Sequence, residues 1–321
     1  MKSYTYHHKK TNLSRAHLVG MLLMVGFVVG ILTPQGAYAQ ERRIIDVQLH
    51  ALSLDMFPAQ YDKRIGYERP ESPRALRSQS IEQMERFNIV KAVVSGEPEL
   101  VKNYKKAAPN RVVKSIWIPD RLTGDSLRRY LDSLPRWYRQ GKFEIIGEVL
   151  TQYKGIAPND PILDPLWSFA AREGVPVGIH INDLPSTCPD SLMERCTPMA
   201  LKEVLNAHPG LKVYVMHGGF PHSEDMLAIL NNYPNVYVDA TFFNPKSEKY
   251  LDYLKKLIDA GHGDRIMFGT DQMLWPELIG LFVQAIENAD FLSEEQKQDI
   301  FYDNAARFFG IGKDKTLGAI E

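Results

Sequence analysis

Gln48 and His50 stand at the end of Ile44–His50, a short apolar run with the β-branched residues of a strand. Residues two positions apart on a strand point to the same side, so the amide and the imidazole would leave the strand together. Such a pair could bind a metal ion or orient a substrate. An unrelated strand could carry the same two side chains by chance, so the interpretation depends on the ends of the other strands.

Four further apolar runs end in ionisable side chains, which are Glu148, His180, His217 and Asp271. Each has a structural alternative when taken alone: a satisfied core histidine, a carboxylate paired with a lysine, or a helix cap. Buried together with His50, these groups cost free energy unless a cation or a reaction uses them. Nitrogen and oxygen ligands without thiolate suit zinc, manganese, iron or nickel. The pattern therefore predicts a divalent metal site.

The runs that must position these residues number eight, and they alternate with amphipathic helical stretches. Strands that alternate with helices pair in parallel, and eight such units predict an α/β fold of the (β/α)8 barrel type. The alternative is an open, doubly wound sheet, which usually has a Gly-rich turn after its first strand, and no such turn follows His50. In a barrel, the carboxyl ends of all strands lie on the face where active sites are built. The predicted strands are Ile44–His50, Ile89–Ser95, Val112–Ile118, Phe143–Leu150, Val175–Ile181, Leu211–His217, Val236–Ala240 and Arg265–Asp271. The predicted helices are Ser80–Phe87, Glu97–Lys106, Gly124–Arg139, Pro165–Glu173, Pro198–Ala207, Ser223–Asn231, Lys246–Ala260 and Trp275–Asn288.

Residues 51–79, between the first two strands, show no regular pattern. A loop this long is uncommon unless it is functional or disordered, so we expect either a lid over the active face or a solvated excursion. Leu292–Gly310 predicts a strong helix packed against the barrel. Because no linker or second domain is evident, we expect the barrel to span residues 40–312 and residues 313–321 to fray.

The first 39 residues have the pattern of a secretory signal peptide. Basic residues precede an uncharged apolar run, Leu18–Leu32, and Ala37–Ala39 forms a small-x-small cleavage motif. An uncleaved anchor is the alternative, but the run is shorter than the roughly 20 residues of a spanning helix. Cleavage removes four basic residues and no acidic one, which moves the formal net charge from −1 to about −5. We therefore expect an exported, periplasmic or secreted protein that touches the membrane only through its transient leader and has no nucleic-acid partner.

The two cysteines, Cys188 and Cys196, lie in one polar loop. In an exported protein a pair this close predicts a local disulfide, with two free thiols as the alternative. Two cysteines alone cannot build a structural zinc site.

Taken in order, the strand ends resemble the amidohydrolase superfamily, in particular its "amidohydrolase 2" branch of metal-dependent hydrolases and decarboxylases. The resemblance covers about residues 44–311, and it implies a distorted (β/α)8 barrel. It rests on the pattern at residues 46–50, Gly147 with Glu148, His180, His217–Gly219, Phe268–Asp271 and the closing Asn304–Gly310.

The chain departs from the family pattern at the first strand. The family usually has His-x-His where this chain has Gln48 and His50. In binuclear members, one metal uses both first-strand histidines and the last-strand Asp. The other metal uses the fifth- and sixth-strand histidines, and a fourth-strand carboxylate bridges the two. An amide is a poorer zinc ligand than an imidazole, so Gln48 weakens the first metal position and leaves the second intact.

The resemblance therefore implies a single divalent ion on Glu148, His180 and His217, with zinc favoured and manganese, iron or nickel as alternatives. Asp271 would accept a proton from the attacking water and later protonate the leaving group. His50 would orient the substrate carbonyl or the water.

A competing arrangement places the ion on His50, His180 and Asp271. Gln48 would then be a weak oxygen ligand, and His217 would polarise the substrate.

Loops after the strands would line the substrate pocket. Lid arginines would suit a carboxylate, because arginine binds that group through two hydrogen bonds. Aromatic residues at these positions could instead simply pack the barrel rim. The predicted substrate-binding residues are Gln48, Arg64, Arg69, Tyr153, Asn182 and Trp275.

Three functions on a small molecule remain open. The first is hydrolysis of a C–O or C–N bond in a lactone, ester or amide. The second is non-oxidative decarboxylation, which the same family branch runs on aromatic or unsaturated acids and which export slightly disfavours. The third is a binding protein in which Gln48 records lost catalysis. The sequence also leaves a homo-oligomer open.

Overall fold

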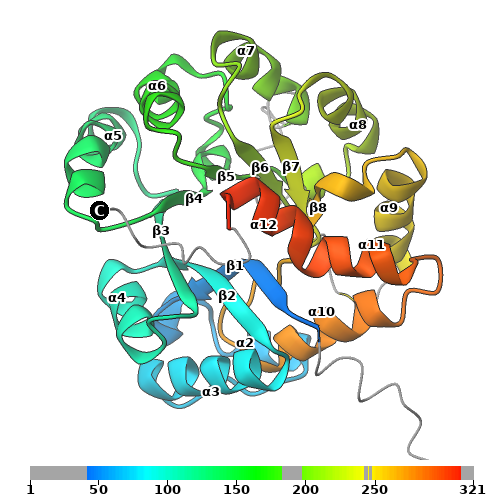
Figure 1. The fold of residues 1–321 in the computed structure, drawn as a ribbon. Coiled ribbons are helices and arrows are strands. Elements are labelled where there is room, and N and C mark those ends of the chain that lie inside the picture. The colour runs from blue at the N-terminus through cyan, green and yellow to red at the C-terminus, as the bar shows by residue number, and fades with distance from the viewer. Residues whose placement is uncertain (1–41, 183–196, 242–244, 246–247, 312–321) are drawn as a thin grey trace, which may run out of the picture. The chain divides into compact units, whose positions relative to one another are not determined.

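The computed structural model describes residues 42–182, 197–241, 245 and 248–311. Eight parallel strands pair in sequence order around one sheet, which confirms the predicted (β/α)8 barrel (Figure 1). The strands are β1 (Ile44–Ala51), β2 (Ile89–Gly96), β3 (Val112–Ile118), β4 (Ile145–Val149), β5 (Val177–His180), β6 (Val213–Met216), β7 (Val236–Asp239) and β8 (Ile266–Met267).

The segment after β8 closes the barrel against β1. His50 N donates to Gln272 O at 2.9 Å, and Asp271 N donates to Gln48 O at 2.9 Å. These backbone hydrogen bonds bring Asp271 beside the two polar residues at the end of β1.

Helices between the strands form the outer ring (Figure 1). In α5, the buried residues Leu127, Leu131 and Leu134 recur every three or four positions, which gives the helix one apolar face to pack inward. The helices are α2 (Gln60–Ile65), α3 (Pro73–Arg86), α4 (Pro98–Ala107), α5 (Gly124–Arg139), α6 (Asp164–Glu173), α7 (Leu201–Ala207), α8 (Ser223–Asn232), α9 (Glu248–Asp259), α10 (Glu277–Glu287), α11 (Glu294–Gln298) and α12 (Asn304–Phe309).

The last helices close the amino-terminal end of the barrel, and α12 lies across it (Figure 1). Phe308 and Phe309 share one buried cluster with residues from the strands, among them Val47 and Tyr214. The predicted continuous helix over Leu292–Gly310 is interrupted by a π-helical segment, Asp299–Asp303. Because side chains fill this end, the opposite end is left to build a site.

Residues 52–72, which we call the lid, are folded, so the prediction of an irregular stretch over residues 51–79 was wrong. A 3-10 turn, Leu54–Met56, and α2 lie within the lid. Helix α3 begins at Pro73 because Ser72 Oγ accepts a hydrogen bond from Ala75 N at 3.1 Å. Apolar lid residues pack with Trp117, from β3, and Trp275, which follows β8. The lid therefore packs at the carboxyl end of the barrel.

Some predictions fall outside the described residues. These are the leader (residues 1–39), the disulfide between Cys188 and Cys196, and the tail (residues 313–321). In the part that is described, no helix has both the length and the apolar character needed to cross a bilayer.

Candidate metal centre

Three buried side chains converge at the ends of β4, β5 and β6, and we call Glu148, His180 and His217 the inner cluster. His180 Nδ1 lies 2.5 Å from Glu148 Oε1. His217 Nε2 lies 2.9 Å from His180 Nδ1 and 3.3 Å from Glu148 Oε1. None of the three residues is more than 5% exposed. The structure thus brings together the three residues that the sequence proposed as metal ligands.

A second set, His50, Glu148 and Asp271, shares the glutamate, and we call it the outer cluster. His50 Nε2 lies 2.9 Å from Asp271 Oδ1 and 3.4 Å from Glu148 Oε2. Glu148 therefore turns one oxygen toward each cluster. The Asp271 side chain is 24% exposed, whereas that of His50 is 5% exposed. In both clusters the candidate ligand atoms all lie within 4.8 Å of one another.

The inner cluster has the donor chemistry of a cation site. The backbone oxygen of Thr241 lies 2.9 Å from His217 Nδ1. Because a carbonyl only accepts, Nδ1 carries a proton, and Nε2, which faces Glu148 and His180, is the atom that could bind a metal ion in place of its own proton. A carbonyl partner of this kind usually stands behind a metal-ligating histidine. Two imidazoles and a carboxylate therefore fit the divalent ion that the sequence predicts.

The charges of the inner cluster also favour a cation. Burial alone would raise the pKa of Glu148, but the neighbouring histidines hold it well below its ordinary value of 4.5. Burial would lower the pKa of His217, yet the hydrogen bond to Glu148 and the nearby carboxylates raise it to about 10. Burial and His217 together lower the pKa of His180. The ionised Glu148 thus attracts positive charge, either as a proton on His217 or as a metal ion.

Two site residues have a left-handed backbone. The φ angle is 58° at His217 and 47° at Asp271, and Asn88 is the one other described non-glycine residue with positive φ. Such conformations cost about 1–3 kcal/mol and persist where surrounding contacts hold them. Here His217 N donates to Asp239 Oδ1 at 2.8 Å, and Asp271 is held by its backbone bond to β1. These bonds fix the direction in which both side chains enter the site.

Two buried carboxylates that the sequence did not mark as site residues, Asp46 and Asp239, hold the backbone of the site through hydrogen bonds. Asp46 Oδ2 accepts from Thr270 Oγ1 at 2.6 Å, and Asp239 Oδ1 lies 2.6 Å from Thr241 Oγ1. Burial is the main cause that raises the pKa of Asp46 to about 7 and that of Asp239 to about 6. Their hydrogen bonds hold the backbone on which Asp271 and His217 stand.

Ser95 is a further residue that the sequence analysis missed. Its Oγ lies 3.0 Å from His50 Nδ1, so it can orient the ring whose Nε2 faces Asp271. Ser95 and Asp239 are the last polar residues of the predicted strands that became β2 and β7. The other site residues were found at such strand ends, so the same criterion would have found these two.

Several predicted substrate-binding residues lie close to the clusters. The Tyr153 ring packs against that of His180, with centroids 5.0 Å apart. Asn182 is buried just after β5, where its backbone oxygen accepts from Gln152 Nε2. Gln48 is 1% exposed and contacts Asp271. Contact with substrate remains a prediction for all three.

Arg69 instead holds the lid together, and Trp275 ties the lid to the barrel. Arg69 Nε donates to both oxygens of Asp62, at 2.9 and 3.0 Å, and its two terminal nitrogens donate to lid carbonyls. Trp275 is 2% exposed, and its Nε1 donates to Asp62 Oδ1 at 2.8 Å. These contacts leave little of either side chain for the predicted substrate. Arg64 lies in α2, and its side chain falls outside the described part.

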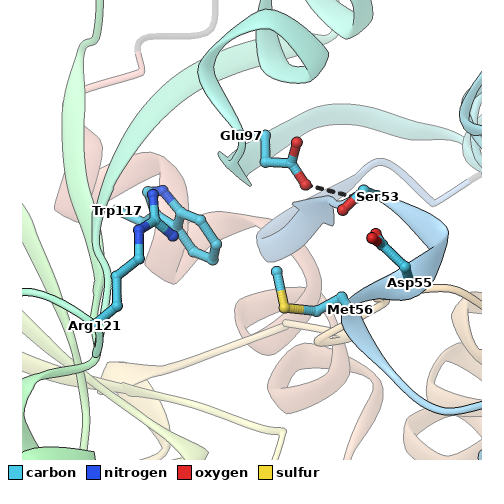
Figure 2. Close-up of a pocket in the computed structure, with 6 residues that line it drawn as sticks. All are labelled: Ser53, Asp55, Met56, Glu97, Trp117 and Arg121. Carbon is cyan, nitrogen blue, oxygen red and sulfur yellow. Dashed lines mark hydrogen bonds between the residues drawn. The ribbon is translucent and has the colours of Figure 1, made fainter.

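A cavity of about 440 Å³ opens at the same end of the barrel. In Figure 2, Glu97 and Asp55 lie on one side of it, and Trp117 and Arg121 lie on the other. Glu97 Oε1 accepts a hydrogen bond from Ser53 N at 2.8 Å, and the Arg121 guanidinium lies 5.8 Å from the centre of a Trp117 ring. Met56 completes the lining. Arg121 is the one cation among these lining residues, and no sequence pattern had marked it as a site residue.

Comparison with known proteins shows the family to which this chain belongs. The family model described as "Amidohydrolase" matches residues 45–311. Protein fluG of Emericella nidulans is 21% identical over 143 residues, which are 39% of this chain and 16% of that protein. The chain thus spans about a sixth of the length of this curated relative.

Solved structures with the same fold include proteins of different activities. An uncharacterised TIM-barrel protein from Bordetella bronchiseptica is 20% identical, with a TM-score of 0.65 over 84% of this chain and 98% of that one. A probable 2-pyrone-4,6-dicarboxylic acid hydrolase from Acinetobacter baumannii is 14% identical, with a TM-score of 0.60 over 84% and 99%. A 5-carboxyvanillate decarboxylase from Novosphingobium aromaticivorans, complexed with manganese, is 16% identical, with a TM-score of 0.56 over 85% and 97%. At these identities the likeness shows the fold alone.

Proposed function

Because the chain belongs to the amidohydrolase family, whose members include hydrolases and decarboxylases, we propose that it is a metal-dependent hydrolase. Its reaction is the cleavage of a C–O or C–N bond in a small lactone, ester or amide. The observation that carries this proposal is the position of Asp271. Its partly exposed carboxylate lies 2.9 Å from His50 and beside the buried inner cluster, so a proton acceptor borders a cation site.

One divalent ion binds at the inner cluster, on Glu148, His180 and His217. Zinc and manganese both suit this donor set. When bound, the ion polarises the scissile carbonyl and lowers the pKa of the attacking water. The competing arrangement on His50, His180 and Asp271 is less favourable, because these three are not among the groups of described residues whose ligand atoms all lie within 4.8 Å of one another, whereas the inner cluster is.

Asp271 is the general base and then the general acid. Its carboxylate takes one proton from the attacking water as the water oxygen bonds to the carbonyl carbon. The bond to the leaving oxygen or nitrogen then breaks, and the leaving group receives the proton from Asp271. His50 holds the Asp271 carboxylate in place, and Ser95 holds the His50 ring.

The cavity beside Arg121 receives the rest of the substrate. Trp117 offers a flat apolar wall, and Arg121 offers a guanidinium for which no ion pair within 4.0 Å is found in the described part of the chain. A small planar substrate with a carboxylate fits this combination, because arginine binds carboxylates through paired hydrogen bonds. Arg121 thereby takes the role that the sequence predicted for the lid arginines Arg64 and Arg69.

Non-oxidative decarboxylation is the second candidate. The aromatic wall at Trp117 favours it, since an aromatic acid would stack there, and a solved relative of the same fold is named as an aromatic-acid decarboxylase. In that reaction the C–C bond to the carboxylate breaks, and a proton replaces carbon dioxide on the ring. A binding protein without catalysis is the third alternative. It would be supported if the purified protein bound no metal and converted none of the substrates tested.

One experiment separates these functions. The purified mature protein, loaded with zinc chloride or manganese chloride, is offered a panel of lactones, esters, amides and aromatic acids. Metal-dependent release of acid from a lactone, ester or amide is the expected result. Release of carbon dioxide from an aromatic acid without hydrolysis of the panel would overturn the hydrolase assignment.

Export is part of the proposal and rests on the leader pattern in residues 1–39. Expression of the full chain in a Gram-negative host, followed by fractionation and mass determination, tests it. We expect a periplasmic product that starts after Ala39, and a full-length cytoplasmic product would contradict export.

A further inference from the structure

A buried chain of hydrogen bonds joins two outer helices to the segment that carries Asp271. The Tyr104 hydroxyl, from α4, lies 3.2 Å from Ser80 Oγ, in α3. Ser80 Oγ lies 3.0 Å from Gln272 Oε1, and Gln272 Nε2 lies 2.9 Å from the backbone oxygen of Met273. Tyr104 is 2% exposed, and Ser80 and Gln272 are 0% exposed. None of these residues lines the cavity or belongs to the inner or outer cluster.

The last acceptor of this chain determines the direction of every hydrogen bond in it. A backbone carbonyl only accepts, so the Gln272 amide nitrogen faces Met273 and the amide oxygen faces Ser80. The Ser80 hydroxyl must therefore donate to Gln272, and its oxygen is left to accept from Tyr104. Burial raises the pKa of Tyr104 to about 12, so this hydroxyl keeps the proton that it donates at neutral pH. Each proton of the chain thus has a single acceptor.

Gln272 connects this chain to the proposed general base. Its backbone oxygen accepts from His50 N at 2.9 Å, and the preceding residue, Asp271, donates from N to Gln48 O. Asp271 has a φ angle of 47°, a conformation that persists only where surrounding contacts hold it. Strand β1 holds this segment through the backbone, and α3 holds it through the Gln272 side chain. Asp271 is therefore fixed from both sides.

Packing of the helices alone does not require these polar groups. Replacing both partners of a buried hydrogen bond by apolar groups of the same shape can be nearly neutral for stability. A fully satisfied buried chain instead adds rigidity and a unique geometry. The rigidity here is applied at the residue next to Asp271.

We propose that Ser80, with Tyr104 behind it, is a positioning residue for Asp271, because it fixes Gln272 and through it the direction in which the Asp271 carboxylate enters the site. The inference rests on the proposed function, since it takes Asp271 as the general base. Ser80 and Tyr104 are buried away from the cavity, so they act through Asp271 and not on the substrate.

The test introduces Ser80→Ala into the wild type and into Asp271→Asn. All proteins are loaded with zinc chloride, and kcat and KM are measured with the panel substrate that the wild type hydrolyses fastest. In the wild-type background we expect kcat to fall about tenfold, because a slightly misplaced reacting group is costly. KM and the metal content should stay unchanged. In Asp271→Asn the same substitution should leave the residual kcat unchanged, because no base remains to be positioned.

Two further variants complete the design. Gln272→Met breaks the chain at its other end with a side chain of similar volume, and it replaces Ser80→Ala in both backgrounds if that variant does not fold. Ser133→Ala is the matched control, because Ser133 Oγ donates to the backbone oxygen of Arg129 within its own helix, α5. It should leave kcat unchanged.

A purely structural chain would give a different result. An unchanged kcat in Ser80→Ala and Gln272→Met, or the same fractional loss of kcat with and without Asp271, would overturn the inference and leave the hydrolase proposal standing. Full activity in Asp271→Asn alone would instead remove Asp271 as the base, and with it the mechanism under the proposed function.

Discussion

His50 Nε2 and Asp271 Oδ1 lie 2.9 Å apart although the two residues are separated by 221 positions in the chain. One residue ends the first strand and the other follows the last, so this contact exists because the barrel closes. Barrel closure thus assembles the proposed general base and its partner.

Asp271→Asn should abolish hydrolysis without removing the metal. The asparagine keeps the shape but cannot accept the proton, so we expect kcat to fall by roughly 10²–10⁴-fold. Elemental analysis of the same preparation should still find one ion per chain. Full activity in Asp271→Asn would show that another group serves as the base.

Arg69→Gln should weaken the fold more than substrate binding. It leaves Asp62, which is 8% exposed, with the Trp275 indole as its one remaining side-chain donor among those described. Loss of one partner from a buried ion pair typically costs about 3–5 kcal/mol, so urea unfolding should show a decrease approaching that range. Proteolysis should also cut the lid faster. A raised KM with unchanged unfolding would instead support the substrate role first predicted for Arg69.

Arg121→Gln is the matched control for Arg69 and has the opposite expectation. Because Arg121 is exposed, the free energy of unfolding of Arg121→Gln should differ little from that of the wild type. The KM for a carboxylated substrate should rise by about tenfold, equivalent to about 1.4 kcal/mol. The KM for the neutral methyl ester of the same compound should stay unchanged. An equal change for both compounds would mean that Arg121 does not bind the carboxylate.

Asp46 should make the metal-free protein less stable as pH rises. Burial raises its pKa from 3.8 to about 7, so between these values the folded state holds a proton that the unfolded state has released. The stabilisation that this proton contributes is therefore complete below pH 3.8, the pKa of Asp46 in the unfolded chain. It is lost as the pH rises through about 7, the pKa in the folded protein. Asp46→Asn removes this dependence. Urea unfolding at several pH values should show a flatter profile for Asp46→Asn, with a difference on the order of a few kcal/mol. Parallel profiles for the two proteins would contradict the assignment.

Much of the barrel could be predicted from the sequence because its signals are local. Parallel strands buried on both faces read as apolar runs, and their carboxyl ends must share one face. That rule placed Glu148, His180 and His217 in one site before any tertiary information. The predicted boundary of the last strand was wrong, because β8 ends at Met267 and the segment up to Asp271 makes single hydrogen bonds to β1 in place of a regular ladder, although Asp271 still lies in the site.

The roles of Arg69 and Trp275 could not be read from the sequence. Both depend on Asp62, whose carboxylate contacts a residue 7 positions away and another 213 positions away. An arginine that stabilises a lid and one that binds substrate look alike until such partners are placed. The same holds for Thr241, whose contact with Gln48 joins residues 193 positions apart.

The metal content of Glu148→Ala and His50→Ala, purified side by side, tests the central claim most directly. If the ion sits on Glu148, His180 and His217, Glu148→Ala should lose it and His50→Ala should keep it. Retention of the ion in Glu148→Ala together with its loss in His50→Ala would place the metal on the competing set, and the proposed role of Asp271 would then be wrong.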